Sequence, residues 1–273
     1  MREIARLDIG RVVAERFPGK HIPQFVINLL ARILRQNDIN RLFSCAEGKT
    51  DLEFIDVCME HLDFTCQVIG EENLPTDGNP CIFVSNHPQG GAEAICLAYI
   101  LGHKYDGKIK FYANEILSIL EPLQGLFLPI YKNKQQSREN VRVVKEFYKT
   151  DAHLIVFPAG LTAYKLKGKI IDHAWQKSFI KSAVENKRNI VPLYFQARNS
   201  DLFYFVENFR RRIRSKIKFD VLLFANEFFK QKGKTFHLYI GKPISPETFD
   251  TNKNQQEWAD WVREVTFGLP MQE

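Results

Sequence analysis

The stretch CIFVSNHPQGGAEAICLAYIL, from Cys81 to Leu101, holds an apolar run, a turn with one proline and two glycines, and a second apolar segment. We predict that Cys81–Asn86 is a strand, since short apolar runs that end in turn residues are typical of buried strands. The segment Ala92–Leu101 is predicted as a helix. A strand that passes through a tight turn into a helix indicates an α/β fold, in which loops at strand ends carry functional residues.

The rest of the chain continues this alternation of strands and helices. Further strands are predicted at Ile109–Asn114, Leu126–Tyr131, His153–Pro158 and Asn189–Phe195. Helices are predicted between them, at Ser137–Lys149 and Trp175–Asn186. Such alternation predicts a sheet covered by helices on both faces, with His87, Pro158 and Arg198 at or just past strand ends.

The N-terminal part differs from this pattern. Apolar residues recur at helical spacing from Ile22 to Leu34, which predicts an amphipathic helix. We expect this helix to pack on the domain, with docking to a membrane as the alternative. The predicted organisation is therefore a helical segment at residues 1–64, packed on a main domain at residues 65–273 that ends in a helix.

Composition limits the classes of function. The chain has 273 residues, of which 45% are hydrophobic and 26% charged, as is usual for a folded protein. Its five cysteines have no CxxC spacing, which indicates reduced thiols in a cytoplasmic setting and neither a disulfide framework nor a zinc site. No uncharged apolar run approaches the about 20 residues that a spanning helix needs. The net charge of +6 favours phosphate-bearing or other anionic partners.

His87 and Glu93 lie on the two sides of the turn. Pro88 favours an extended backbone at His87, and Glu93 falls in the first turn of the predicted helix, where a carboxylate is favoured. A carboxylate that binds one ring nitrogen fixes the tautomer and leaves the other nitrogen as a base. The nucleophile would then be a substrate hydroxyl or amine. For an isolated pair, the competing explanation is that both residues only stabilise the turn and cap the helix.

Four blocks of sequence resemble one known family. NHPQGGAE is similar to the NHP-x-G-G/A-x-D motif of PlsC-like glycerolipid acyltransferases, in the bacterial hemolysin-like branch that contains GRNS. The second, third and fourth blocks of that family resemble Gly125–Lys132, Phe157–Gly160 and Ile190–Tyr204, in the same order. The resemblance runs from about Val68 to Phe205. It implies a mixed, largely parallel central sheet flanked by helices.

The resemblance also implies an activity and a site. It implies an O-acyltransferase that moves a fatty acyl chain from acyl-CoA or acyl carrier protein (ACP) to a lysolipid such as lysophosphatidic acid, in phospholipid or aminolipid biosynthesis. His87 would be the general base, and Glu93 would stand where the family has aspartate. No cofactor or metal is expected. The predicted substrate-binding residues are Asn86, Gly90, Gly91, Asn114, Lys132, Phe157, Pro158, Gly160, Lys165, Lys169, Arg198 and Asn199.

Several positions depart from the family pattern. Ala159 replaces the usual glutamate of the third block, and Tyr131 falls at the arginine expected in the second, with Lys132 beside it. Lysine offers a phosphate a point charge but no bidentate fork. These departures leave open an acceptor with another headgroup, such as a lyso-aminolipid of the glycine or ornithine type. They also leave open a lipid ester or thioester hydrolase, and a degenerate relative that binds lipid or ACP without turnover.

Basic residues predict the partners. Lys165 and Lys169 could form a rim for an acidic headgroup or for the donor, and Arg198 could bind phosphate or carboxylate. The run from Arg210 to Lys218 lies beside aromatic residues, a pattern typical of proteins that bind anionic membrane surfaces. A solvated basic face is the competing explanation. We expect a cytoplasmic protein bound peripherally to the inner face of the cell membrane, and no nucleic acid partner.

Overall fold

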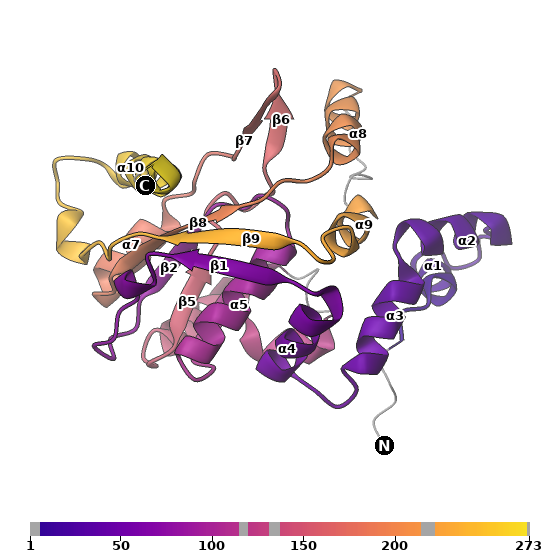
Figure 1. Cartoon of the computed structure of the whole chain (residues 1–273), viewed down its shortest axis with the longest axis horizontal. Coiled ribbons are helices and arrows are strands. Elements are labelled where there is room, and N and C mark those ends of the chain that lie inside the picture. Colours follow the sequence, from indigo (N-terminus) through magenta and orange to yellow (C-terminus); the bar gives the residue numbers. More distant parts are fainter. Residues whose placement is uncertain (1–5, 115–119, 131–136, 214–221, 272–273) are drawn as a thin grey trace.

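The computed structural model describes residues 6–114, 120–130, 137–213 and 222–271, and its centre is a seven-stranded sheet (Figure 1). The strand order is β1-β9-β8-β2-β5-β3-β4. The strands are β1 (Thr65–Ile69), β2 (Ile82–Ser85), β3 (Ile109–Asn114), β4 (Phe127–Ile130), β5 (His153–Val156), β8 (Ile190–Gln196) and β9 (Thr235–Ile240). All neighbours pair in parallel except β8 and β9, which are antiparallel. The predicted mixed, largely parallel sheet is confirmed.

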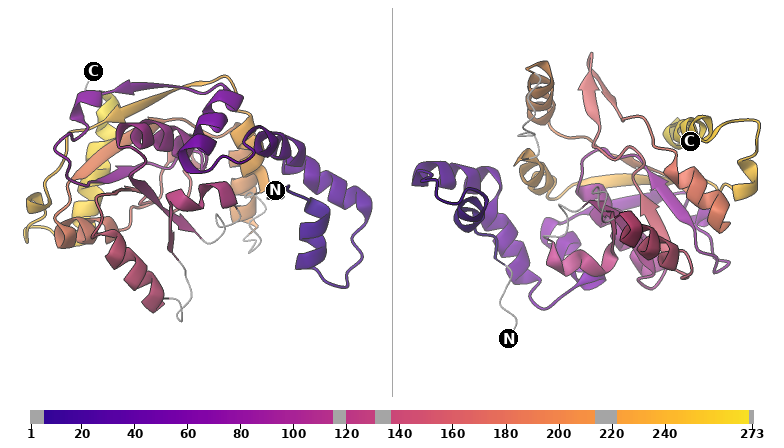
Figure 2. Two further views of the ribbon diagram at one scale, coloured as in Figure 1. Left: turned by 90° about the horizontal axis from the view of Figure 1, so that it is seen from below. Right: turned by 180° about the vertical axis from the view of Figure 1, so that it is seen from behind.

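Alternate residues of a strand point to opposite sides of the sheet, and in the central strands both sets are apolar. Helices therefore cover both faces of the sheet. Phe83 of β2 joins a core with α4 (Asp51–Leu62) and α5 (Ala92–Lys104). Its neighbours Ile82 and Val84 belong to a second core, on the other face. The helices of that face are α6 (Ser137–Phe147), α7 (Ser178–Asn186) and the C-terminal α10 (Gln255–Gly268). The views in Figures 1 and 2 show this arrangement of three layers.

The sheet order explains why three sequence blocks meet. β2 lies between β5 and β8 and is parallel to both, so the carboxyl ends of the three strands share one edge. Asn86 extends the pairing of β2 with β8, since its side chain accepts a hydrogen bond from Phe195 N (2.7 Å) and donates one to Phe195 O (3.0 Å). The residues that follow β2, β5 and β8 therefore converge at this edge.

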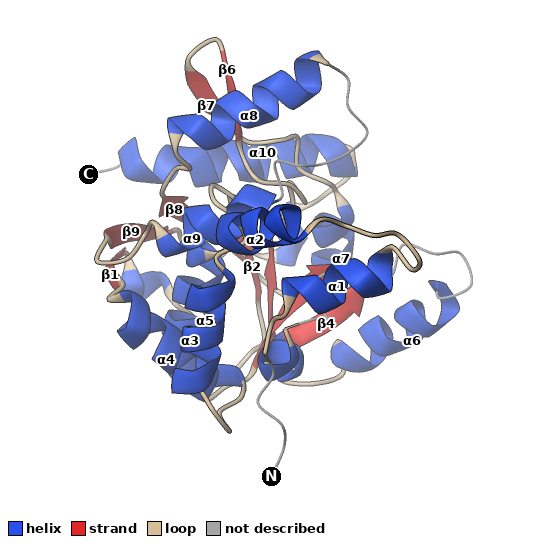
Figure 3. Cartoon of the chain, turned by 90° about the vertical axis from the view of Figure 1, so that its right-hand side faces the viewer, coloured by secondary structure: helices blue, strands red, loops and turns tan. Residues whose placement is uncertain are grey.

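Three further elements lie near this edge of the sheet. A two-stranded hairpin, β6 (Tyr164–Leu166) and β7 (Lys169–Ile171), packs beside α8 (Asp201–Arg212), as Figure 3 shows. The short helix α9 (Phe224–Phe229) contacts the turn after β2. The predicted strands and helices all exist, but β1, β9 and the hairpin were not predicted. Polar residues interrupt their apolar patterns, as in TCQVI and TFHLYI, and such short strands at or near a sheet edge carry weak signals.

The N-terminal helices α1 (Ile9–Arg16), α2 (Gln24–Ile33) and α3 (Gln36–Cys45) lie at one side of the molecule (Figures 1 and 2). α3 buries Leu42 in the core that contains α4 and α5. The apolar stripe of α2 is only partly covered: Val26, Ile27, Leu30 and Ile33 are half-buried, whereas Phe25 and Leu29 are 72% and 52% exposed. Within the described ranges, no helix is long and apolar enough to cross a membrane.

Candidate active site

The turn after β2 is tightly packed. Gly90 has a φ of 95°, and a Cβ there would lie 2.9 Å from Thr162 Cγ2, so both the backbone and the space require glycine. A Cβ on Gly91 would lie 3.1 Å from the ring of Phe228 on α9. We expected the two glycines to let a ligand approach. Thr162 and α9 pack against them, and both glycines also line the cavity that His87 faces, so their predicted role in binding substrate stays a prediction.

The Glu93 carboxylate organises this turn. It is fully buried in the first turn of α5 and accepts hydrogen bonds from three backbone amides: Gln89 N (3.0 Å), Gly90 N (2.7 Å) and Gly91 N (3.1 Å). These amides precede the helix, and the positive end of its dipole also favours the carboxylate. Glutamate is one methylene longer than the aspartate of the family motif. In this turn its carboxylate reaches all three amides.

The same carboxylate orients His87. Its Oε1 lies 2.9 Å from His87 Nδ1, in an ion-pair contact that lacks the alignment of a hydrogen bond. The imidazole ring also stacks on Phe157, with a centroid distance of 4.4 Å and an interplanar angle of 23°. The backbone oxygen of His87 accepts a hydrogen bond from Ala163 N at 2.8 Å. With Nδ1 directed at Glu93, Nε2 is the ring nitrogen available to a substrate.

Burial and hydrogen bonding have opposite effects on the pKa of Glu93. Burial alone would raise this pKa, because it disfavours the charged carboxylate. The proximity and charge of His87, together with the amides of Gly90 and Gln89, outweigh burial and hold the pKa of Glu93 below its usual value of 4.5. The carboxylate is therefore ionised at neutral pH, as an orienting partner for an imidazolium must be.

His87 lines a cavity of about 590 Å³. Its walls come from α3, α4, α5, β3, α9 and the segment after β5, and most of the lining side chains are apolar, including Leu42, Ile95, Phe111 and Phe228. The volume falls in the range of small-molecule sites. A long apolar group can thus lie in the cavity while a reactive group at its end meets the imidazole.

The fourth block supports the turn through its backbone and amide groups. Gln89 Nε2 donates to Arg198 O (2.8 Å), and Asn199 Nδ2 donates to Pro88 O (3.4 Å). Ser200 N and Oγ both donate to the buried Glu227 of α9, at 2.6 and 2.7 Å. Asn199 is itself buried. Asn86 and Asn199 therefore join elements of the fold, and the role in binding substrate that we predicted for them stays a prediction.

Two predicted basic residues meet at one carboxylate. Lys165 Nζ and Arg198 Nη2 lie 2.8 and 2.5 Å from Asp201 Oδ1. Both residues lie beside the turn after β2. The backbone amide of Ala163, two residues before Lys165, donates to His87 O, and the backbone oxygen of Arg198 accepts from Gln89 Nε2. The cluster carries one net positive charge.

The remaining predicted residues have different places. Phe157 and Pro158 line the cavity, as does Gly160, whose φ of 64° requires glycine. Lys169 is exposed on β7. Asn114 ends β3, but its side chain is not described, and Lys132 lies outside the described residues.

Sequence reasoning missed three contributors to the site. Gln89 ties the turn to the fourth block, Asp201 holds the two cations, and α9 supplies aromatic side chains to the turn and the cavity. Asp201 had a signal, since it follows Arg198 by three residues, a spacing that allows a pair across a helix start. The segment FANEFF of α9 gave no indication that it would contact a turn more than 130 residues earlier. Among the described residues, no group of three His, Cys, Asp or Glu could hold a metal.

Glu93→Gln tests the electrostatics of the turn. The amide keeps the size of the side chain but loses the charge, so the free energy of unfolding should fall by about 1.5–3 kcal/mol near neutral pH. Because the folded pKa of Glu93 is depressed, this advantage of the wild type is complete above the unfolded value near 4.5 and decreases as pH falls through the folded pKa.

Urea unfolding as a function of pH measures both effects. Glu53→Gln, an exposed glutamate in the first turn of α4, is the matched control and should change little. A gap between wild type and Glu93→Gln that stays constant into acid would contradict a depressed pKa.

Comparison with known proteins agrees with this geometry. A family model described as "Acyltransferase" matches residues 11–271. The chain is 40% identical over 250 residues to a lyso-glycine lipid O-acyltransferase of Phocaeicola vulgatus, covering 92% of this chain and 89% of that protein. It is 38% identical over 265 residues to a lyso-glycine lipid O-acyltransferase of Bacteroides thetaiotaomicron, covering 96% and 97%.

A solved structure shares the fold. The chain aligns with the 1-acyl-sn-glycerophosphate acyltransferase PlsC of Thermotoga maritima with a TM-score of 0.50 and 18% identity, covering 90% of this chain and 88% of that one. At this identity, the likeness concerns the fold alone. The predicted PlsC-like fold is confirmed, as is the assignment to the O-acyltransferases. The chain is a member of the acyltransferase family.

Proposed function

We propose that this acyltransferase moves a fatty acyl chain from acyl-ACP or acyl-CoA to the hydroxyl group of a lyso-glycine lipid. The observation that carries the proposal is a His87 ring held by Glu93 at 2.9 Å and facing an apolar cavity of about 590 Å³. The two relatives that are 40% and 38% identical bear the name of this activity, which supports the choice of acceptor.

His87 acts as the general base in the proposed reaction. Nε2 takes the proton of the acceptor hydroxyl as its oxygen attacks the thioester carbonyl, and the resulting imidazolium is stabilised by the Glu93 carboxylate. The carbon–sulfur bond then breaks, and the leaving thiolate receives that proton to give the thiol of CoA or ACP. The acyl chain of the donor lies in the apolar cavity, with its carbonyl carbon beside Nε2.

Lys165 and Arg198 bind the acceptor headgroup in this proposal. Glycine that is joined to a lipid through its amino group keeps a free carboxylate, and Arg and Lys are suited to bind it. In the structure, the exposed Asp201 carboxylate occupies both cations, in the way a substrate carboxylate would. The headgroup therefore competes with Asp201 for the pair.

The enzyme meets its lipid at the inner face of the cell membrane. Support comes from α8, where Leu202, Phe205, Phe209 and Ile213 recur every three or four residues and are all at least half exposed. Arg210 and Arg212 flank this stripe at the start of the predicted basic run, and residues 214–218 of that run lie outside the described ranges. Apolar side chains flanked by arginines are suited to an anionic bilayer surface.

A labelled acyl-transfer assay tests the function. The donors are acyl-CoA and acyl-ACP, and the acceptors are lyso-glycine lipid and lysophosphatidic acid in vesicles. We expect acylated glycine lipid, with turnover lowered by about 10² to 10⁴ in His87→Ala because the general base is lost. The variant should still fold, which its far-UV circular dichroism spectrum checks against that of the wild type.

The controls separate the alternatives. His21→Ala removes an exposed histidine of the N-terminal segment and should keep full turnover. Free fatty acid as the only His87-dependent product would instead identify a hydrolase. No product with any pair of donor and acceptor would contradict the proposed function.

Asp201→Asn tests the headgroup site. Because the competing carboxylate is removed, KM for lyso-glycine lipid should fall about two- to five-fold, the size expected for an exposed ion pair, with kcat unchanged. The paired change Lys165→Gln with Arg198→Gln should raise KM. An acceptor with a methyl-esterified headgroup should respond to neither change.

Glu185→Gln is the matched control, since it neutralises an exposed carboxylate that pairs with Lys181 on α7. A higher KM in Asp201→Asn would mean that Asp201 holds the cations in place and does not compete with the headgroup.

A further inference from the structure

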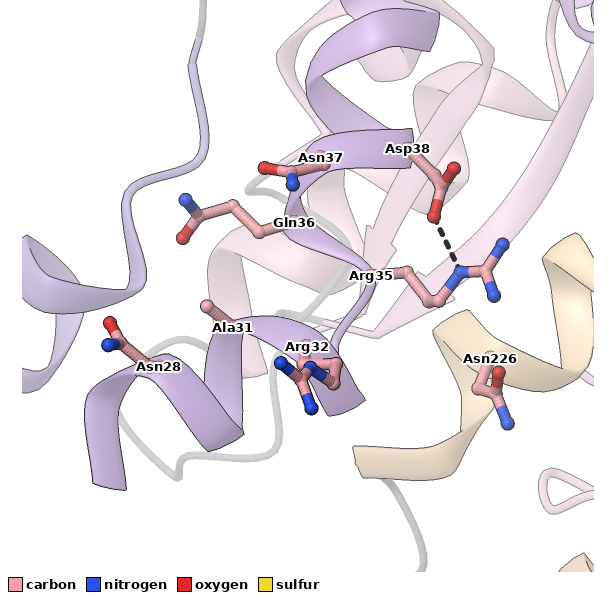
Figure 4. Close-up of a pocket in the computed structure, with 8 residues that line it drawn as sticks. All are labelled: Asn28, Ala31, Arg32, Arg35, Gln36, Asn37, Asp38 and Asn226. Atoms are coloured by element: carbon pink, nitrogen blue, oxygen red, sulfur yellow. Dashed lines mark ion pairs between the residues drawn. The ribbon is translucent and has the colours of Figure 1, made fainter. Parts of the chain in front are cut away.

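A second cavity, of about 620 Å³, lies between the turn that joins α2 to α3 and the helix α9 (Figure 4). None of its lining residues lines the catalytic cavity. Its character is also different, because its walls are polar: two arginines, one aspartate and several amides face it. The lining residues that matter here are Asn28, Arg32, Arg35, Asn37, Asp38 and Asn226.

The charges of the pocket favour an anion. Arg32 and Arg35 contribute two positive charges and Asp38 one negative charge, which leaves one positive charge. Arg35 Nε lies 2.6 Å from Asp38 Oδ2, but this ion pair lacks the alignment of a hydrogen bond. The donors of the guanidinium group are therefore not used up by Asp38. A ligand with one negative charge would neutralise the pocket.

The position of Arg35 is set by its neighbours. Its guanidinium carbon lies 5.7 Å from the ring centroid of Phe229, in a cation–π contact with α9. Figure 4 shows the side chain extending from the α2–α3 turn toward α9, where Asn226 lies. The amides of Asn28, Asn37 and Asn226 add further donors and acceptors to the lining of the pocket. Such a set suits a carboxylate or phosphate that carries further polar groups.

The surroundings of the pocket indicate that the anion belongs to a lipid. On α2, the exposed Leu29 follows the pocket residue Asn28 directly, and the exposed Phe25 lies three residues before it. Exposed apolar side chains beside cationic ones are typical of surfaces that meet a bilayer. We propose that this pocket binds the anionic headgroup of a membrane lipid, at a site separate from the catalytic one.

Such binding would connect two parts of the chain. The pocket is formed by α2 and α3 on one side and by α9 on the other. α9 also contributes Phe224, Phe228 and Phe229 to the catalytic cavity. A headgroup that contacts both sides would hold the N-terminal helices against α9.

The test compares two variants with the same loss of charge. Arg32→Gln with Arg35→Gln removes both guanidinium groups of the pocket. Arg16→Gln with Arg41→Gln removes two exposed arginines of the same N-terminal helices that do not line it. Binding is measured by sedimentation with vesicles of phosphatidylcholine, with and without phosphatidylglycerol.

We expect the pocket variant to bind the anionic vesicles about ten-fold more weakly than the wild type, and the control variant less than about three-fold. Binding to pure phosphatidylcholine should be equal for all three proteins. His87→Ala should bind like the wild type, which makes the result independent of the proposed reaction. An equal loss in both double variants would overturn the proposal, since it would show a general effect of charge.

A further variant leaves the arginines in place. Asn226→Asp introduces a carboxylate into the opposite wall of the pocket, which should repel the headgroup and weaken binding to the anionic vesicles. Unchanged binding in this variant would contradict the proposal. Titration with inorganic phosphate, followed by calorimetry, tests the source of the anion. Saturable binding of phosphate that requires Arg32 and Arg35 and matches the vesicle affinity would show a site for small anions and overturn the assignment to a lipid.

Discussion

The buried carboxylate of Glu93 is the interaction on which the site depends. A charge without solvent is costly unless it is paired and hydrogen-bonded, and this carboxylate satisfies the condition with three backbone amides and one imidazole. These contacts constrain both the backbone of the turn and the orientation of His87. The amides fix the path of the turn and the start of α5, and the contact with Nδ1 fixes which edge of His87 faces the cavity. One side chain thus sets both local structure and chemistry.

The sheet supplies the second constraint. Because β5, β2 and β8 run side by side in parallel, the aromatic ring of Phe157 and the loop of Arg198 arrive on opposite sides of the catalytic turn. The loop is then fixed to that turn by Gln89 and to α9 by Glu227. The same helix α9 also lines the apolar cavity beside His87. His87, the apolar cavity and the two cations Lys165 and Arg198 therefore belong to one connected set of contacts.

Much of the fold, and the contact between His87 and Glu93, could be predicted from sequence, and the reasons are physical. Strands such as Ile82–Ser85 are buried on both faces and therefore appear as continuous apolar runs, whereas β1 and β9 mix polar and apolar residues. His87 and Glu93 lie in one turn, so their spacing alone brings them together. A motif does not say in which direction a side chain points, and the side chains of Asn86 and Asn199 both bond to the backbone of the fold. The half-covered stripe of α2 shows a related limit, because amphipathic spacing predicts a helix but not what covers its apolar face.

The position of one proton on the neutral His87 ring decides whether Nε2 can act as the base. If Glu93 holds His87 as described, the neutral ring carries its proton on Nδ1, and Nε2 is unprotonated and able to accept one. Nitrogen NMR of the protein with labelled histidine, with His87→Ala used to assign the signal, measures this directly. We predict that the neutral ring of His87 carries its proton on Nδ1, and that Glu93→Gln removes this preference for the Nδ1–H tautomer. A wild-type His87 ring with its proton on Nε2 would contradict the proposed role of His87, because the nitrogen that faces the substrate could not then act as the base.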